Sequence, residues 1–193
     1  MNSSLPKIKG LIFYGSILVS VLLAFSHQTK TLGQASLILL TLVIFTKPLA
    51  RLFPTINLFK VLLAVRRETG QAGAFAAFGH VASQVFRGVP LFDLLQFSFS
   101  GGPQSFQFWG FWTLILMAIL FLTSNDISTR LLKRNWFRLH QLIHPLYIFA
   151  MIHYGLRGGY LKLILVVFVL FVLYLSRFLA ARGTKFFASS PVI

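Results

Sequence analysis

Six long apolar stretches recur along this chain, separated by short polar or basic segments. A helix needs about 20 predominantly apolar residues to cross the hydrocarbon core of a bilayer, and the stretches approach or reach that length. Hydrophobic residues make up 56% of the chain and charged residues 11%. We therefore predict an all-α integral membrane protein, folded as one six-transmembrane-helix bundle over residues 1–193. The expected helices are about 11–26, 32–52, 71–87, 106–124, 136–156 and 160–180.

The 18 lysines and arginines, which give a net charge of +15, are distributed unevenly among the connecting segments. Cytoplasmic segments of membrane proteins are enriched in Lys and Arg. With both termini in the cytoplasm, the outer segments hold only Lys30, Arg87, Arg157 and Lys162. The inner segments then hold 14 of the 18: Lys7, Lys9, Lys47, Arg51, Lys60, Arg66, Arg67, Arg130, Lys133, Arg134, Arg138, Arg177, Arg182 and Lys185. The charge therefore predicts topology and not nucleic-acid binding.

The absence of cysteine limits the possible metal ligands, and two longer connections join the expected helices. Without cysteine, any metal must be held by nitrogen or oxygen. The connection Phe53–Gly70 contains an amphipathic segment that we expect to lie along the inner surface. The outer connection Gly88–Ser105 is either a cap on the bundle or a lid or docking surface.

The stretch RLHQLIHPLYIFAMIHY, residues 138–154, carries three of the five histidines in an apolar setting. His153 and His80 both fall in the outer half of an expected helix, the fifth and the third. Ionisable groups inside membrane spans are expensive and usually face a partner or cofactor within the bundle. Two neutral imidazoles from neighbouring helices are what the two axial positions of a low-spin haem require.

Small residues precede His80 on the third expected helix. Gly73, Ala76 and Ala77 lie seven, four and three residues before it, so this face would allow a flat macrocycle to approach. The same residues also fit a small-residue helix-packing motif, with His80 only making a hydrogen bond across the bundle. Residue chemistry alone leaves both interpretations open.

Two segments carry a resemblance to a known family. RRETGQAGAFAAFGH and TSNDISTRLLKRNWFRLHQLIHPLYIFAMIHY resemble the ferric reductase-like transmembrane domain family. The resemblance is strongest to the haem-binding membrane subunit of the bacterial periplasmic methionine sulfoxide reductase system. It covers helices three to six best, and its most specific element is RLH followed thirteen residues later by HY. The family is six-helical and carries b-type haem.

The resemblance implies that His80 and His153 are the axial ligands of an outer haem b between helices three and five, and that His140 matches an inner histidine. Similar oxidases have a further histidine about fourteen residues before His80, where this chain has Arg66. One haem or two are therefore expected. Arg66 and Arg67 are candidates to bind haem propionates or the phosphate of FMN, because guanidinium groups suit both; as the alternative, they only determine topology.

Three features of the fifth helix qualify this assignment. Thirteen residues of ideal helix place His140 and His153 about 140° apart, so they do not share a face. Pro145 lies between them, where a proline kinks a helix. His144 is expected to have a structural or hydrogen-bonding role, with inner-haem ligation as the alternative. His27 is expected to be a solvated loop residue.

The resemblance implies an electron-transfer subunit and not a self-contained enzyme. It would carry electrons from a separate cytoplasmic flavin reductase or from quinol, across the bacterial inner membrane, to a periplasmic oxidoreductase such as a molybdenum-containing methionine sulfoxide reductase. The alternative is a haem-free membrane scaffold or a small metal transporter using His140 and His144, whose i, i+4 spacing lets two imidazoles share an ion. Glu68, Asp93 and Asp126 lie at expected helix ends or in loops, which argues against a carboxylate pathway through the membrane.

Overall fold

The computed structural model describes residues 4–158 and 160–182, and within these ranges all regular structure is helical. Most long elements agree with the predicted helices, although α1 and α4 begin several residues earlier than expected. Both begin with basic residues that we had assigned to loops, and a helix tolerates such residues at its ends because long side chains reach the membrane surface. The elements are α1 (Ser4–Phe25), α2 (Thr29–Leu52), α3 (Asn57–Ala64), α4 (Arg66–Phe86), α5 (Leu91–Ser100), η1 (Gly102–Gln104), α6 (Phe106–Leu122), α7 (Asp126–Leu132), α8 (Arg134–Leu139), η2 (His140–Leu142), α9 (Ile143–Leu156) and α10 (Tyr160–Ala181).

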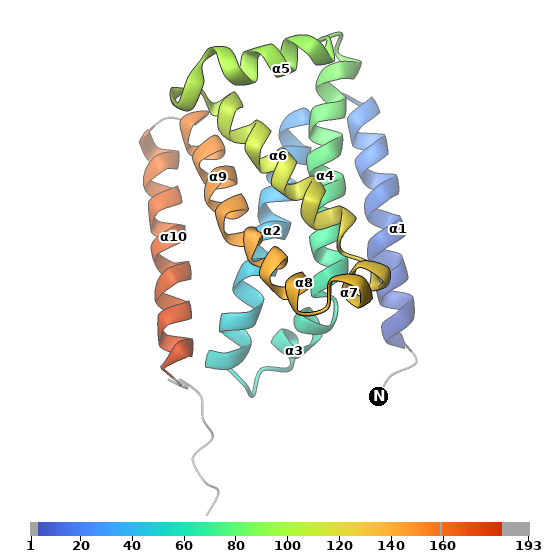
Figure 1. Ribbon diagram of the computed structural model, residues 1–193, viewed down its shortest axis with the longest axis vertical. Coiled ribbons are helices and arrows are strands. Elements are labelled where there is room, and N and C mark those ends of the chain that lie inside the picture. Colours follow the sequence, from blue (N-terminus) through green and yellow to red (C-terminus); the bar gives the residue numbers. More distant parts are fainter. Residues whose placement is uncertain (1–3, 159, 183–193) are drawn as a thin grey trace, which may run out of the picture.

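Helices α1, α2, α4, α6, α9 and α10 run along the long axis of the molecule in alternating directions (Figure 1). Helix α5 lies across one end, which we call the α5 end. Helices α3, α7 and α8 lie at the opposite end, where α1 begins and α10 ends. The segments predicted to be inner and basic lie at this second end, which we call the basic end.

Among the residues that the structure describes, two helices are long and apolar enough to cross a membrane by themselves. These are residues Leu5–Phe25 and Thr29–Leu52, and a third candidate joins α6 to α7 across a bend of 89°. Helix α4 carries three charged residues in its first turn, and α9 has only 14 residues. Large apolar side chains are nevertheless exposed along the molecule, for example Leu11 and Leu18 on α1 and Phe171 on α10. Such a surface suits lipid and not water, so the chain is a membrane protein.

The core forms where five helices meet. Its buried members come from α2, α4, α6, α9 and α10: Leu40, Ile44, Ala74, Met117, Leu120, Leu146, Tyr147, Met151 and Leu173. Tyr147 is 1% exposed, and its hydroxyl lies 3.0 Å from Oγ1 of Thr41 on α2. Because a buried phenol needs a hydrogen-bond partner, this contact joins α9 to α2 in a defined register.

The fifth predicted helix is broken, which corrects our expectation of a continuous helix over residues 136–156. Lys133 has a positive φ of 48°, and the 3₁₀ turn η2 separates α8 from α9. Pro145 is the third residue of α9. Proline has no N–H and is tolerated in the first turn of a helix, so it favours a helix start here and confirms the predicted kink.

Both longer connections contain a helix. In α3 no residue is buried, and Leu58 and Val61 are exposed, as expected of a segment on the inner surface. Helix α5 crosses the end of the bundle and contacts α6 through Phe99 and Phe111, whose ring centroids are 4.9 Å apart. The outer connection therefore caps the bundle.

Candidate functional site

His80 on α4 and His153 on α9 bring their rings together edge to face, and we call them the histidine pair. Their ring centroids are 6.4 Å apart and their ring planes are at 85°. Helix α4 packs mainly against α1 and α2, whereas α9 packs mainly against α6. The two imidazoles therefore reach toward each other from helices that are held by different neighbours.

Each imidazole of the histidine pair is anchored by a backbone carbonyl. Nδ1 of His80 donates to the carbonyl of Thr29 at 2.7 Å, and Nδ1 of His153 donates to the carbonyl of Phe106 at 2.7 Å. Because a carbonyl only accepts, the proton of each neutral ring lies on Nδ1, and Nε2 keeps its lone pair. This tautomer is the one in which Nε2 binds a metal.

The dimensions of the histidine pair fit one metal ion held between two imidazoles. A histidine nitrogen lies about 2 Å from a bound transition metal, and the ring centroid lies about 1 Å behind that nitrogen, so a shared metal requires centroids about 6 Å apart. The observed 6.4 Å meets this requirement. His80 and His153 would be the two residues that hold a haem iron if one binds here.

The small residues before His80 have a different role from the one that we considered first. A side chain at Gly73 would contact Leu39 and the backbone of Ser36 on α2. Ala76 belongs to a buried cluster with Ala24 of α1 and Leu32 of α2. For these two positions the structure favours helix packing over an open face for a macrocycle.

The other two membrane histidines lie toward the basic end and have separate partners. The ring of His140 stacks on Trp136 with centroids 3.9 Å apart, and its Nε2 lies 3.3 Å from Oγ1 of Thr123. His144 accepts a hydrogen bond from Arg177 of α10, whose Nη1 lies 2.6 Å from Nε2. His27, in contrast, is exposed in the turn between α1 and α2.

Arg66 and Arg67 are adjacent in sequence but differ in their contacts. Arg67 donates to the carbonyl of Ser124 at 2.9 Å and pairs with Asp126 at 2.6 Å. This hydrogen bond and the charge of Arg67 hold the pKa of Asp126 below its usual range. Arg66 is partly buried, and its Nε donates to the carbonyl of Val43 at 3.0 Å. Within residues 4–158 and 160–182, the Nη groups of Arg66 have no hydrogen-bond partner and can bind a further acceptor.

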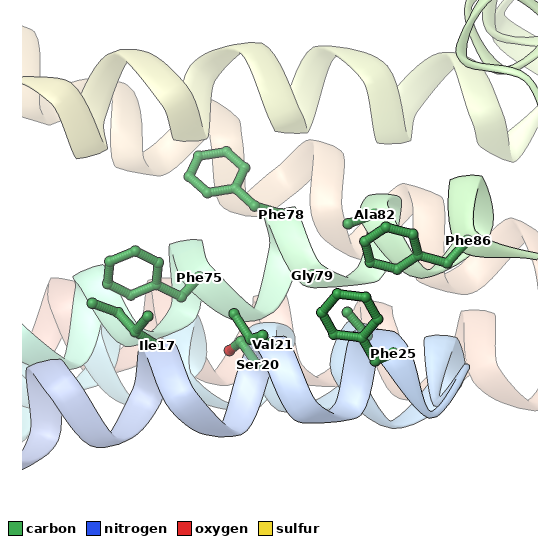
Figure 2. A pocket seen from close by; sticks show the side chains of 10 residues that line it. Ile17, Ser20, Val21, Phe25, Phe75, Phe78, Gly79, Ala82 and Phe86 are labelled. Atoms are coloured by element: carbon green, nitrogen blue, oxygen red, sulfur yellow. The ribbon is translucent and has the colours of Figure 1, made fainter.

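An apolar cleft lies on the surface between the packed helices α1 and α4 (Figure 2). Its volume is about 240 Å³. Its lining is almost entirely aliphatic and aromatic: Ile17, Ser20, Val21, Ala24, Phe25, Phe75, Phe78, Gly79, Ala82 and Phe86. The ring of His80 contacts α2 instead. The cleft suits an acyl chain, and neither His80 nor His153 lines it.

The two backbone carbonyls were missed by sequence reasoning, because a backbone acceptor has no signature in residue type. The histidines themselves were found by their depth in apolar helices. The residues that the structure describes form a helical membrane protein that brings two imidazoles together edge to face, an arrangement also found in proteins that bind a redox centre.

The chain belongs to the family described as ferric reductase like transmembrane component, whose profile matches residues 32–151, well over half of the 193 residues. This membership identifies a membrane electron-transfer component. The matched range includes His80 and His140 and ends two residues before His153. Comparisons with curated proteins and with solved structures found no match.

Proposed function

We propose that this chain is a b-type haem membrane cytochrome whose iron is held between His80 and His153. The observation that carries the proposal is the histidine pair, with centroids 6.4 Å apart and both Nδ1 atoms bonded to carbonyls. When bound, the haem supplies one-electron redox chemistry. With both His80 and His153 as ligands, the site would favour electron transfer over oxygen binding.

The position of the histidine pair near the α5 end supports an outer site. Thr29 and Phe106, which anchor the two rings, are the first residues of α2 and α6, and both helices start at the α5 end. With the basic end in the cytoplasm, the six long helices form a six-span bundle with both termini inside. His80 and His153 would then hold the haem near the outer face, and it would supply electrons there to an external acceptor.

The basic end is proposed as the entry side for electrons. His140 is the candidate ligand for an inner haem, and Arg66 is the candidate to bind a haem propionate or the phosphate of FMN through its Nη groups. We assign this role to Arg66 in preference to Arg67, because Arg67 already binds Asp126. The donor would be a separate cytoplasmic flavin reductase or quinol.

The acceptor is proposed from the family resemblance. The haem-binding membrane subunit MsrQ passes electrons to a periplasmic molybdenum enzyme that reduces methionine sulfoxide, and the same acceptor class would serve this chain in a bacterial inner membrane. The capping helix α5 lies nearest to such a partner, since it covers the end of the bundle where the histidine pair is found.

A haem-free scaffold or small metal transporter is the second candidate. It would require His140 and His144 to share an ion, but one stacks on Trp136 and the other binds Arg177. No group of three or more His, Cys, Asp or Glu that could hold an ion occurs among the described residues. A protein-only zinc site requires three or four ligands, so this function is less well supported.

An absorption spectrum of the purified protein, with pyridine-haem quantification, tests the proposal. We expect the reduced-minus-oxidised bands of a six-coordinate b-type cytochrome, with one or two haems per chain. A colourless preparation from haem-replete cells would contradict the proposed function and favour the scaffold.

A further inference from the structure

The two imidazoles of the histidine pair are seated in the same way on two different helices. Each donates to the carbonyl of the first residue of a helix, Thr29 in α2 and Phe106 in α6. In both helices the residue four positions later is a glycine, Gly33 in α2 and Gly110 in α6. Residues four apart lie one above the other on the same helix face. Each imidazole therefore lies beside a carbonyl and against the glycine of the next turn.

Both glycines are in direct contact with the rings. A methyl carbon at Gly110 would lie 2.7 Å from Nδ1 and 2.9 Å from Cε1 of His153. A methyl carbon at Gly33 would lie 3.0 Å from Nδ1 and 3.2 Å from Cε1 of His80. Non-bonded carbon atoms are usually about 3.5–4.0 Å apart, so neither position accepts a side chain while the ring stays in place.

Helix packing alone does not account for these contacts. At Gly79, an added methyl would meet the backbone carbonyl of Ser20 at 3.1 Å, as expected where two helices approach closely. At Gly33 and Gly110, the three nearest atoms all belong to an imidazole ring. The space left by these two glycines is therefore filled by the rings of the histidine pair.

We propose that Gly33 and Gly110 are positioning residues for His80 and His153. Their missing side chains let each imidazole edge reach the helix carbonyl, so that Nδ1 carries the proton and Nε2 faces the metal. The inference rests on the proposed function for the identity of that metal as haem iron. The contacts of the two rings with the glycines and the carbonyls do not depend on the proposed function.

The chemical consequence is a stronger ligand. A carbonyl oxygen has two lone pairs, so it can accept from the ring as well as from the N–H within its helix. Donation from Nδ1 raises the basicity of Nε2. A more basic axial ligand stabilises ferric over ferrous iron and lowers the reduction potential. The two glycines would thus tune the haem without touching it.

Alanine at either position separates positioning from packing. In Gly110→Ala the nearest obstacle is the end of the His153 side chain, which can move, so we expect the protein to fold with the ring displaced from the carbonyl of Phe106. Haem content should fall and the reduction potential of the remaining haem should rise. Gly33→Ala should act in the same direction but less strongly, because its methyl overlaps less. Gly73→Ala, at ordinary contact distance from α2, is the matched control and should change neither quantity.

A second measurement needs no haem. In the full-length chain labelled with ¹⁵N-histidine and purified from haem-deficient cells, His80 and His153 should show the Nδ1–H tautomer by NMR. Gly110→Ala should alter the signal of His153 and leave that of His80 unchanged. If Gly110→Ala does not fold, Gly33→Ala carries the same test with the two histidines exchanged.

The outcomes distinguish the two proposals. If the wild type binds haem and both alanine variants keep its content, potential and ring tautomers, the positioning role is wrong while the cytochrome stands. If the wild type from haem-replete cells holds no haem but Gly110→Ala still changes the tautomer of His153, the seating of the rings stands while the cytochrome is wrong.

Discussion

At the scale of single residues, backbone contacts separate the histidines by role. His80 and His153 each use Nδ1 on a carbonyl and keep Nε2 for a ligand. His140 stacks on an indole, and His144 accepts from Arg177. Side chains of one type, in one apolar chain, therefore have three different environments, and the centroid distance of 6.4 Å in the histidine pair is close to that of two imidazoles sharing a metal.

The first prediction compares these histidines. His80→Ala and His153→Ala should each lower the outer haem content about tenfold or more, because a lost ligand also leaves the other imidazole without its partner in a dry bundle. His140→Ala should leave the spectrum of that haem largely intact but slow its reduction from the cytoplasmic side. Pyridine-haem content and reduction kinetics measure both effects.

His144→Ala should have a smaller effect, and His27→Ala, at an exposed turn, is the control. Full haem content in His80→Ala together with haem loss in His144→Ala would require the ligands to be reassigned.

The second prediction concerns Arg66. If Arg66 binds a propionate or phosphate through its planar guanidinium, Arg66→Lys should restore only part of the haem-reduction rate that Arg66→Ala loses. Arg138→Ala, another basic-end arginine with an exposed side chain, is the control and should behave as the wild type. A rate in Arg66→Lys equal to that of the wild type would show that charge alone is sufficient.

At the scale of elements, the sharp turn between α6 and α7 is held by one local helix cap and by hydrogen bonds from α4. Oδ1 of Asn125 caps α7 by accepting from the backbone N–H of Ser128 at 2.8 Å. Arg67 of α4 then binds the carbonyl of Ser124 and the carboxylate of Asp126. These contacts dock α7 against the start of α4, so the 89° bend follows from polar anchoring at the basic end.

The third prediction is a pH dependence of this docking. The hydrogen bond from Arg67 and its charge lower the pKa of Asp126 in the folded protein, so the stabilisation is present above the unfolded pKa of about 4 and is lost as the pH falls through the lower, folded value. The melting temperature of the wild type should therefore exceed that of Asp126→Asn at pH 6, with the difference shrinking toward pH 3. The effect should be small because the pair is exposed. A difference that grew on acidification would refute the assignment.

At the scale of the whole molecule, the cluster of basic residues and the histidine pair lie toward opposite ends. Helices α3, α7 and α8 gather basic residues at one end, whereas the carbonyl anchors of the histidine pair lie at the other. This polarity gives the proposed electron path its direction, from the basic end to the α5 end.

The fourth prediction tests that direction. A reporter fused after Lys185, which lies outside the described residues, should read as cytoplasmic. One inserted between Gly101 and Gly102, at the α5 end, should read as external. Fusions in α3 and after Arg87 provide an independent pair for the same comparison. The opposite readings would reverse the electron path.

By itself, the sequence determined the helical class and five of the six long helices, because hydropathy reports on the membrane along the chain. The depth of His80 and His153 in the membrane stays a prediction from the basic residues. The sequence also indicated the kink at Pro145, since proline acts on its own backbone. The helix α5 and the 3₁₀ turn η2 that interrupts the fifth predicted helix were not predicted, because such short segments depend on contacts at the bundle ends.

Only the tertiary structure decided which groups meet. Gly73 and Ala76 pack against neighbouring helices, whereas Gly33 and Gly110, which drew no attention in the sequence, lie against the rings. The reason is physical: the orientation of an imidazole is set by a carbonyl and an empty space on another helix. Such backbone features have no residue-type signal, so they become visible only once α2 lies beside α4 and α6 beside α9.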